Sequence, residues 1–248
     1  MKLRIIDNMR LITRKSDVRI RLEECILAYD RDGLIACCDT VYKTLLLHKV
    51  KFPLLEFCGT QLYDTLLEID QIPFCDQIQA LKTEGGNVIL GIMLQKRLEH
   101  HYDQSIQRAT QYIADADIWY VCDIIGERVW GVSLLQTPEK TISVIEKKTH
   151  HESNWVIRSL GAGIHYAIKK GLPKEHVKTL FDLLLTCANT NDKEIRQGIG
   201  WAAKTTAKFH PDIIRFRESE LNNTQDVAAW FRKKVEIGLQ RHQYAKRN

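Results

Sequence analysis

The chain has 248 residues, of which 44% are hydrophobic and 27% charged, with five prolines and 13 glycines, and this composition excludes a disordered protein. Its formal net charge of +5 is too small by itself to indicate a nucleic-acid partner. It contains no run of about 18 uncharged apolar residues that could span a bilayer, and its beginning carries scattered charges instead of the apolar run of a signal peptide. We therefore expect a cytoplasmic protein and no membrane partner.

The cysteines are odd in number and form no CxxC pair of the kind found in zinc or redox sites. Most of them lie among apolar residues, where free cysteine packs as a small hydrophobic side chain. We expect reduced thiols in the core, and a reactive thiol is the alternative. The seven residues are Cys25, Cys37, Cys38, Cys58, Cys75, Cys122 and Cys187.

Helical periodicity recurs along the first half of the chain, whereas the alternation typical of strands is nearly absent. Apolar residues at helical spacing predict a helix over 17–29, and a second helix over 62–69 that stops before Pro73. Another helix is predicted around 106–113.

Capping residues and prolines predict five helices in the second half. Their expected caps or first residues are, in chain order, Thr137 with Pro138, Ser153 or Asn154, Pro173, Asn191 or Asp192, and Thr224. Three of these helices are expected to end near Gly171, Ala188 and His210.

About a dozen helices of 10 to 18 residues, joined by short turns, predict an all-α protein. Consecutive antiparallel hairpins favour an α-solenoid, in which each hairpin buries its apolar face only against its neighbours. A globular helical bundle stays open, because no strict sequence repeat is visible. No linker-like stretch divides the chain, so we expect a single domain over 1–248.

Two tryptophans have a charged partner on the same helix face. Trp119 and Asp123 are spaced i, i+4 in an apolar helix, and Trp155 and Arg158 are spaced i, i+3 in another. A carboxylate in so apolar a helix needs a cationic partner or a function. The residues alone leave two interpretations open, a functional site or a buried Asp123–Arg158 ion pair that joins neighbouring hairpins.

A third tryptophan follows two glycines within one helical segment. Gly198 and Gly200 reduce helix stability, so we expect something to approach them closely. Trp201 is then either a core aromatic residue or part of the same site.

These motifs, in this order, resemble the DNA alkylation repair family, in particular the HEAT-like-repeat alkylpurine DNA glycosylases of the AlkD type. The similarity extends over roughly 20–240, and the spacings between the motifs also fit, with Arg158 35 residues after Asp123 and Trp201 43 residues after Arg158. The matching motifs are Trp119-x-x-x-Asp123, Asn154-Trp155-x-x-Arg158-Ser159 and Gly198-Ile199-Gly200-Trp201-Ala202.

The resemblance implies a monofunctional DNA glycosylase of base excision repair, with Asp123 as the catalytic carboxylate. N3- or N7-alkylated purines carry a positive charge, so the base leaves without a general acid. Asp123 then stabilises the oxocarbenium sugar and positions water. Such a reaction requires neither a metal nor a nucleotide cofactor.

The resemblance also implies that the protein grips the DNA backbone and leaves the lesion largely stacked. Trp119 and Trp201 are expected to cradle the lesion nucleotide, and Arg158 to hold a phosphate. The partner is duplex DNA that contains alkylated purines, bound by a monomer that joins the nucleoid while on DNA. Further candidate DNA-contacting residues are Tyr120, at the position of a second tryptophan in typical members, Trp155, Arg232, Lys233 and Lys234.

The last three belong to a basic end. The segment from Arg232 to Asn248 contains six basic residues and one acidic residue. Its charge of +5 equals the net charge of the whole chain. This pattern predicts either a solvated helix face or a DNA-binding surface.

Two other functions stay open. One is a non-catalytic HEAT-like-repeat module that binds nucleic acid through the basic end, and the other is a protein-binding scaffold with a structural Asp123–Arg158 pair. The solvent exposure of the candidate site residues distinguishes these two functions from the enzyme. An open basic groove lined by Asp123, Trp119, Trp201 and Arg158 favours catalysis, whereas burial and mutual pairing favour the scaffold.

Overall fold

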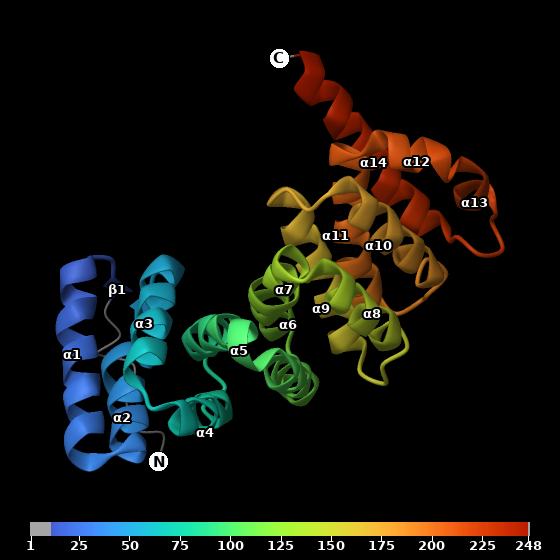
Figure 1. Ribbon diagram of the computed structural model, residues 1–248. Helices are drawn as coiled ribbons and strands as arrows, with labels where there is room; N and C mark the ends of the chain where they lie inside the picture. The colour runs from blue at the N-terminus through green and yellow to red at the C-terminus, as the bar shows by residue number, and fades with distance from the viewer. Residues whose placement is uncertain (1–10, 248) are drawn as a thin grey trace, which may run out of the picture. The chain divides into compact units, whose positions relative to one another are not determined.

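The computed structural model describes residues 11–247, and the protein is 82% helical (Figure 1). Within these residues the only strands are β1 (Leu11–Ile12) and β2 (Lys49–Val50), which form a short parallel pair. None of the helices in this part combines the length and the hydropathy of a bilayer span. The expected all-α class is confirmed.

The chain forms two compact units, the first ending at Tyr102 and the second beginning at Asp103. The boundary lies within the segment α5 (Glu84–Ala116), which consists of two helices. Its backbone departs from helical geometry at His101 (φ −134°, ψ 46°), close to the boundary. The single domain expected over 1–248 stays a prediction.

The first unit places the expected helix over 17–29 inside α1, and α1 packs against both α2 and α3. Between α1 and α2 the chain turns at Gly33, whose φ of +83° is a conformation that glycine adopts without strain. The helices of this unit before α5 are α1 (Lys15–Asp32), α2 (Leu34–Val41), the π-helical turn η2 (Tyr42–Leu46), α3 (Phe52–Thr65) and α4 (Glu68–Ala80).

The expectation of one helix over 62–69 that stops before Pro73 is wrong. The helix α3 ends at Thr65, Leu66 has an extended ψ of 137°, and Pro73 lies inside α4. Pro73 lacks the amide hydrogen that would bond the carbonyl four residues earlier, and α4 tolerates this single loss near its beginning. Leu62 and Leu66 are buried, whereas Ile69 is 80% exposed, so the three side chains do not share one face.

The second unit contains the remaining helices, and four of the five helix starts predicted from the sequence are found there. Asp192 caps α11 through its side chain, whose Oδ1 accepts from the amides of Glu194 and Ile195 at 2.9 Å each. The elements are α6 (Trp119–Ile125), the π-helical turn η3 (Gly126–Trp130), α7 (Gly131–Gln136), α8 (Pro138–Lys148), α9 (Asn154–Lys169), α10 (Lys174–Thr186), α11 (Lys193–Phe209), α12 (Pro211–Phe216), α13 (Glu218–Asn222) and α14 (Ala229–Arg247).

The last helix begins later than expected. Thr224 lies in a turn and does not cap α14, which starts at Ala229. The turn is held by Asn223, whose side chain accepts from the amide of Gln225 at 3.1 Å and donates to Asp226 at 2.6 Å. Local side-chain hydrogen bonds of this kind compete with helix initiation.

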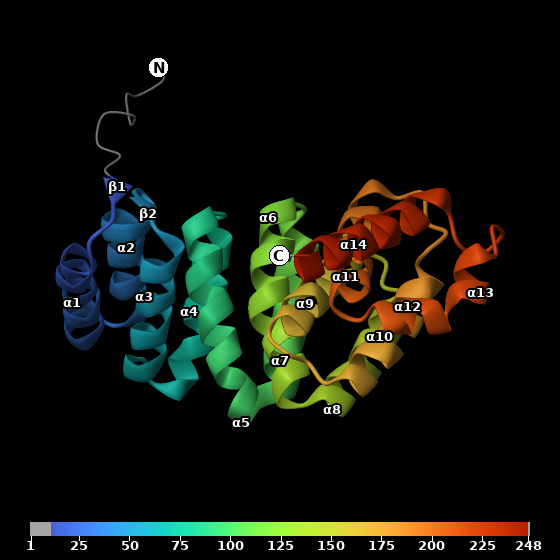
Figure 2. The ribbon, with the colours of Figure 1, turned by 90° about the horizontal axis from the view of Figure 1, so that it is seen from above.

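Four segments of the second unit, α6 with η3, α9, α11 and α14, pack side by side in that order (Figures 1 and 2). Hydrogen bonds join the start of each to the start of the next, so all four begin at the same end. The linked pairs are 38, 38 and 40 residues apart, which reveals a structural period that the sequence does not display. The links run from Trp155 to Asp117, from Asn154 to Asp192, and from Trp230 to the carbonyl oxygen of Thr190.

Glycines let α9 and α11 cross with their backbones in contact. A Cβ atom added to Gly198 would lie 2.1 Å from the carbonyl oxygen of Arg158, and one added to Gly161 would lie 2.2 Å from the backbone of Gly198. The close approach expected at Gly198 is therefore made by α9.

This crossing predicts opposite results for two neighbouring glycines. Gly198→Ala should lower the free energy of unfolding by roughly 3 kcal/mol, because two helix backbones must separate. Gly200→Ala is the matched control: its Cβ would meet only the flexible side chain of Lys234, at 3.0 Å, and alanine favours the helix by about 1 kcal/mol. Urea unfolding of both variants measures the difference. Equal midpoints would contradict the proposed role of the crossing.

The thiols lie where the sequence predicts. All seven cysteines are free and six are buried, whereas Cys187 is partly exposed. Burial raises the pKa of Cys25 to about 11, which keeps this thiol protonated.

Candidate active site

Arg158 joins two carboxylates from the neighbouring helices. From α9, its Nε donates to Oδ1 of Asp123 in α6 at 3.0 Å, and its Nη2 donates to Oδ2 of Asp123 at 2.8 Å. Its Nη1 donates to Oε2 of Glu194 in α11. We call these three residues the carboxylate cluster. One guanidinium between two carboxylates gives the cluster a net charge of −1.

The carboxylate cluster is largely shielded from solvent. The side chains of Arg158, Asp123 and Glu194 are 7%, 13% and 23% exposed. Burial is the largest influence on the pKa of Arg158 and lowers it, but the bonds to Asp123 and Glu194 together outweigh burial and raise this pKa above its usual value. Arg158 therefore stays charged, and both oxygens of Asp123 accept hydrogen bonds from it.

Two tryptophan rings lie close to the guanidinium. The Cζ atom of Arg158 is 5.9 Å from the ring centroid of Trp155 and 5.8 Å from that of Trp201, distances at which cation–π attraction operates. The indole N–H of Trp155 donates to Asp117, a residue in the left-handed conformation (φ 50°) just before α6. The hydrogen bond to Asp117 holds the Trp155 ring near Arg158.

Trp119 has a different environment. It is 56% exposed, and its ring meets Tyr120 edge-on with centroids 5.8 Å apart. Since Trp119 lies one helical turn before Asp123, an exposed aromatic surface lies next to the carboxylate cluster. It is free to contact a ligand.

The structure thus brings together Asp123, Trp155, Arg158 and Trp201, all of them candidates from the sequence, and it adds Glu194. An acidic residue in the first turn of a helix is common, because it complements the helix dipole, so the sequence does not distinguish Glu194. The contacts of these residues with DNA stay predictions. Burial and pairing of Asp123 and Arg158 are what the scaffold interpretation expects, whereas the exposure of Trp119 is what the enzyme interpretation expects.

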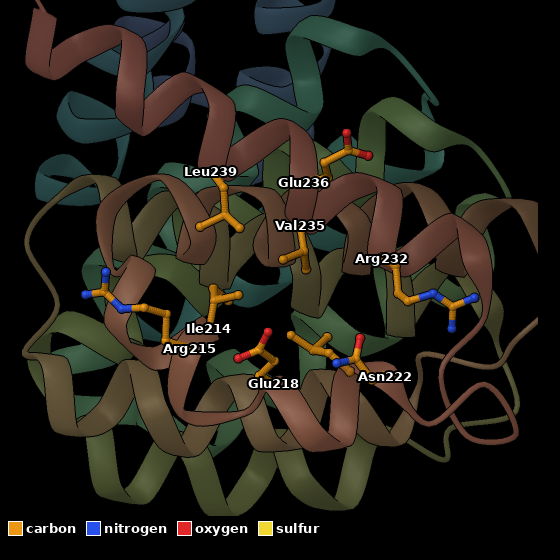
Figure 3. A pocket seen from close by; sticks show the side chains of 9 residues that line it. Ile214, Arg215, Glu218, Asn222, Arg232, Val235, Glu236 and Leu239 are labelled. Carbon is orange, nitrogen blue, oxygen red and sulfur yellow. The ribbon is translucent and has the colours of Figure 1, made fainter.

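The three consecutive basic residues of α14 point in different directions. Arg232 donates to the carbonyl oxygen of Val227 and lines a cavity of about 250 Å³ between α12, α13 and α14 (Figure 3). Lys233 pairs with Glu236 at 2.9 Å, and the side chain of Lys234 lies against α11 at Gly200. The three side chains therefore have three different environments, and that of Lys234 is next to α11.

His165 lies beside Trp201, with ring centroids 6.0 Å apart, and its Nδ1 is 2.6 Å from the hydroxyl oxygen of Thr205. Burial is the main cause that lowers the pKa of His165 to about 4, and the positive charges of Lys169 and Lys204 lower it further. His165 is therefore uncharged at neutral pH.

The lowered pKa of His165 predicts a pH dependence of stability. The unfolded chain takes up this proton near pH 6.5, whereas the folded protein resists protonation until about pH 4. The free energy of unfolding should therefore fall between pH 6.5 and 4, with a contribution from His165 on the order of 3 kcal/mol. His165→Gln should remove this contribution in urea titrations at several pH values, while the exposed control His150→Gln should keep it. An unchanged pH slope in His165→Gln would contradict the assignment.

The structure brings no group of three or more His, Cys, Asp or Glu side chains among its described residues into a metal-binding arrangement. What these residues define is an all-α protein in which three neighbouring helices hold a carboxylate cluster close to two tryptophans. Residues 84–217, more than half of the chain, match the model of the DNA alkylation repair enzyme family, and the chain belongs to this family. Searches of curated proteins and of solved structures found no match.

The family match includes every residue of the carboxylate cluster and its tryptophans, and it ends before α14. It confirms the resemblance stated from the sequence over a shorter range than 20–240. The family is one of enzymes that repair alkylated DNA, and DNA is accordingly the substrate of the chain.

Proposed function

We propose that the protein is a DNA glycosylase that releases N3- or N7-alkylated purines from duplex DNA. One observation carries the proposal: in a member of this family, Asp123 accepts two hydrogen bonds from Arg158 one helical turn from the exposed Trp119. The arrangement holds an ionised carboxylate next to an aromatic surface on which a nucleotide can rest.

The chemistry needs one carboxylate. The N-glycosidic bond breaks with its electron pair on the purine, so the cationic base leaves as a neutral molecule and the positive charge moves to the sugar. A carboxylate about 3.5 Å from that charge contributes on the order of 5 kcal/mol at an effective dielectric constant of 20. Water then adds to C1′ and gives one proton to the solvent. Asp123 fits this role as the stabiliser of the sugar cation.

The net charge of the carboxylate cluster suits a cationic lesion. A site of charge −1 attracts the alkylated base and the oxocarbenium sugar, whereas a neutral base gains nothing from it. Three of the five N–H bonds of Arg158 already donate to carboxylates, so we propose that the main role of Arg158 is to position Asp123. Its two other N–H bonds can still donate to the DNA phosphate that we expect Arg158 to bind.

We also propose an α-solenoid of HEAT-like hairpins as the architecture. Support comes from the parallel order of α6, α9, α11 and α14 and from the links that recur every 38 to 40 residues. The helices α8 and α10 pack on each other and on this row, as the second helices of such hairpins do.

The direct test is release of N7-methylguanine from a methylated duplex by the purified protein, followed by chromatography of the free base. We expect release above spontaneous depurination, with an abasic site left in the strand. Release at the spontaneous rate, from protein that still unfolds cooperatively, would reject the glycosylase.

The second candidate is a non-catalytic member that uses the carboxylate cluster only to join its helices. The burial of Arg158 favours it. It predicts that Asp123→Asn changes stability while base release is absent in both proteins, and the same chromatography therefore separates the two candidates.

A further inference from the structure

A second, positively charged site lies on the same two helices as the carboxylate cluster. It is a pocket of about 200 Å³ between α9, α11 and α14, and we call it the basic pocket. Seven of the described side chains line it, of which four are cationic and none is acidic. The lining residues are His165, Lys169, Lys204, Thr205, Lys208, Phe209 and Arg241.

The cations of the basic pocket lack acidic partners. Among the side chains that the structure describes, no carboxylate lies within ion-pair distance of Lys169, Lys204, Lys208 or Arg241, although Lys233 in α14 has such a partner. Burial lowers the pKa of Lys204, and the nearby charges of Arg241 and Lys234 lower it further. Like charges gathered without a counter-charge are stabilised when an anion binds among them.

The neutral wall of the basic pocket is fixed. Thr205 is only 4% exposed, and its hydroxyl is held by His165 at 2.6 Å. The ammonium group of Lys208 lies 5.1 Å from the ring centroid of Phe209. Long cationic side chains around a rigid polar wall can converge on one small anion.

The basic pocket follows the carboxylate cluster along α9 and α11. His165 comes seven residues after Arg158 in α9, and Lys208 comes seven residues after Trp201 in α11. At about 1.5 Å per residue this displacement is about 10 Å along the helix axes. Measured along the axis of a DNA duplex, that distance corresponds to about three base-pair steps of 3.4 Å.

We propose that the basic pocket is a phosphate-binding site, and that on DNA it holds a backbone phosphate two to three nucleotides from the damaged one. The second part rests on the proposed function. Free inorganic phosphate offers the same chemistry, so the experiment must separate the two sources.

The first arm uses inorganic phosphate at constant ionic strength, with chloride as the balancing anion. Phosphate should raise the melting temperature of the wild type and of the control Lys147→Gln/Lys178→Gln, which loses two exposed lysines outside the basic pocket. It should not raise that of Lys204→Gln/Lys208→Gln. Equal shifts in all three proteins would overturn the assignment of a phosphate site.

The second arm uses a duplex with a tetrahydrofuran abasic analogue, in which one phosphate at a time is replaced by a neutral methylphosphonate. Wild type and control should lose affinity by about 5- to 10-fold when a phosphate two to three nucleotides from the analogue is neutralised. Lys204→Gln/Lys208→Gln should already bind the unmodified duplex more weakly by about that factor and lose nothing further at those positions. Additive losses at every position would overturn the DNA part of the proposal.

The outcomes also separate this inference from the proposed function. Phosphate protection of the wild type without base release rejects the glycosylase and retains the phosphate site. If the protein releases base but Lys204→Gln/Lys208→Gln has no effect in either arm, the glycosylase is retained and the phosphate site in the basic pocket is rejected.

Discussion

Replacing Asp123 with asparagine should abolish release of N7-methylguanine while leaving affinity for undamaged duplex DNA nearly unchanged. Asparagine has the same shape but removes the negative charge opposite the sugar cation. A loss of about 5 kcal/mol corresponds to a rate lower by between three and four orders of magnitude. Single-turnover kinetics with a methylated duplex, beside a binding titration with unmodified DNA, measures both quantities.

Asp115→Asn is a suitable control for this result. Asp115 is exposed near the end of α5 and accepts hydrogen bonds from Gln111, so the variant loses the same charge outside the carboxylate cluster. It should release base at the wild-type rate. If Asp123→Asn also does so, Asp123 is not the catalytic carboxylate.

The second large effect concerns folding. Arg158→Met should lower the free energy of unfolding by about 3–5 kcal/mol at neutral pH, because Asp123 and Glu194 are left as neighbouring, partly buried charges without a cation. Denaturant unfolding of the wild type and the variant at neutral pH measures the loss.

Two further variants identify the cause of that loss. Arg158→Met/Glu194→Gln should recover part of the stability, because one of the two unpaired charges is gone. Arg196→Met removes an exposed arginine of α11 that lies over Trp230, and it should cost little. The contrary result is that Arg158→Met lowers the free energy of unfolding no more than Arg196→Met does, and reduces the slope of log affinity against log salt by about one phosphate contact. That result would show that Arg158 binds DNA and does not stabilise the carboxylates.

The sequence predicts the helices well where a local signal ends them. Gly171, with its φ of +94°, follows α9, and the carboxylate of Asp192 begins α11, as expected. The prediction fails at Pro73 and Thr224, because each residue type is compatible with two local structures. Pro73 is tolerated early in α4, and Thr224 belongs to a turn that Asn223 holds. The neighbouring residues determine which of the two structures forms, so it cannot be predicted from the residue at that position alone.

The candidate site is predicted in part. Asp123 and Arg158 stand out because charged residues on apolar helix faces are unusual, whereas Glu194 does not, because it lies in a first turn where acids are common. Its contact with Arg158 depends on the close crossing of α9 and α11, which is a tertiary property. The same limit applies to the basic residues. Among the side chains that the structure describes, the basic pocket takes Lys204 and Lys208 from α11, and Arg241 alone from the charged end that the sequence singles out.

The backbone contact at Gly198 also bears on which substitutions the protein tolerates. Because main-chain atoms set the separation of α9 and α11 there, the distance between Arg158 and Glu194 does not depend on the sizes of nearby core side chains. Substitutions that change the core volume can therefore lower stability while the spacing of Arg158 and Glu194 persists. Gly161 and Gly198 are then among the positions that tolerate the fewest substitutions, although neither has a side chain.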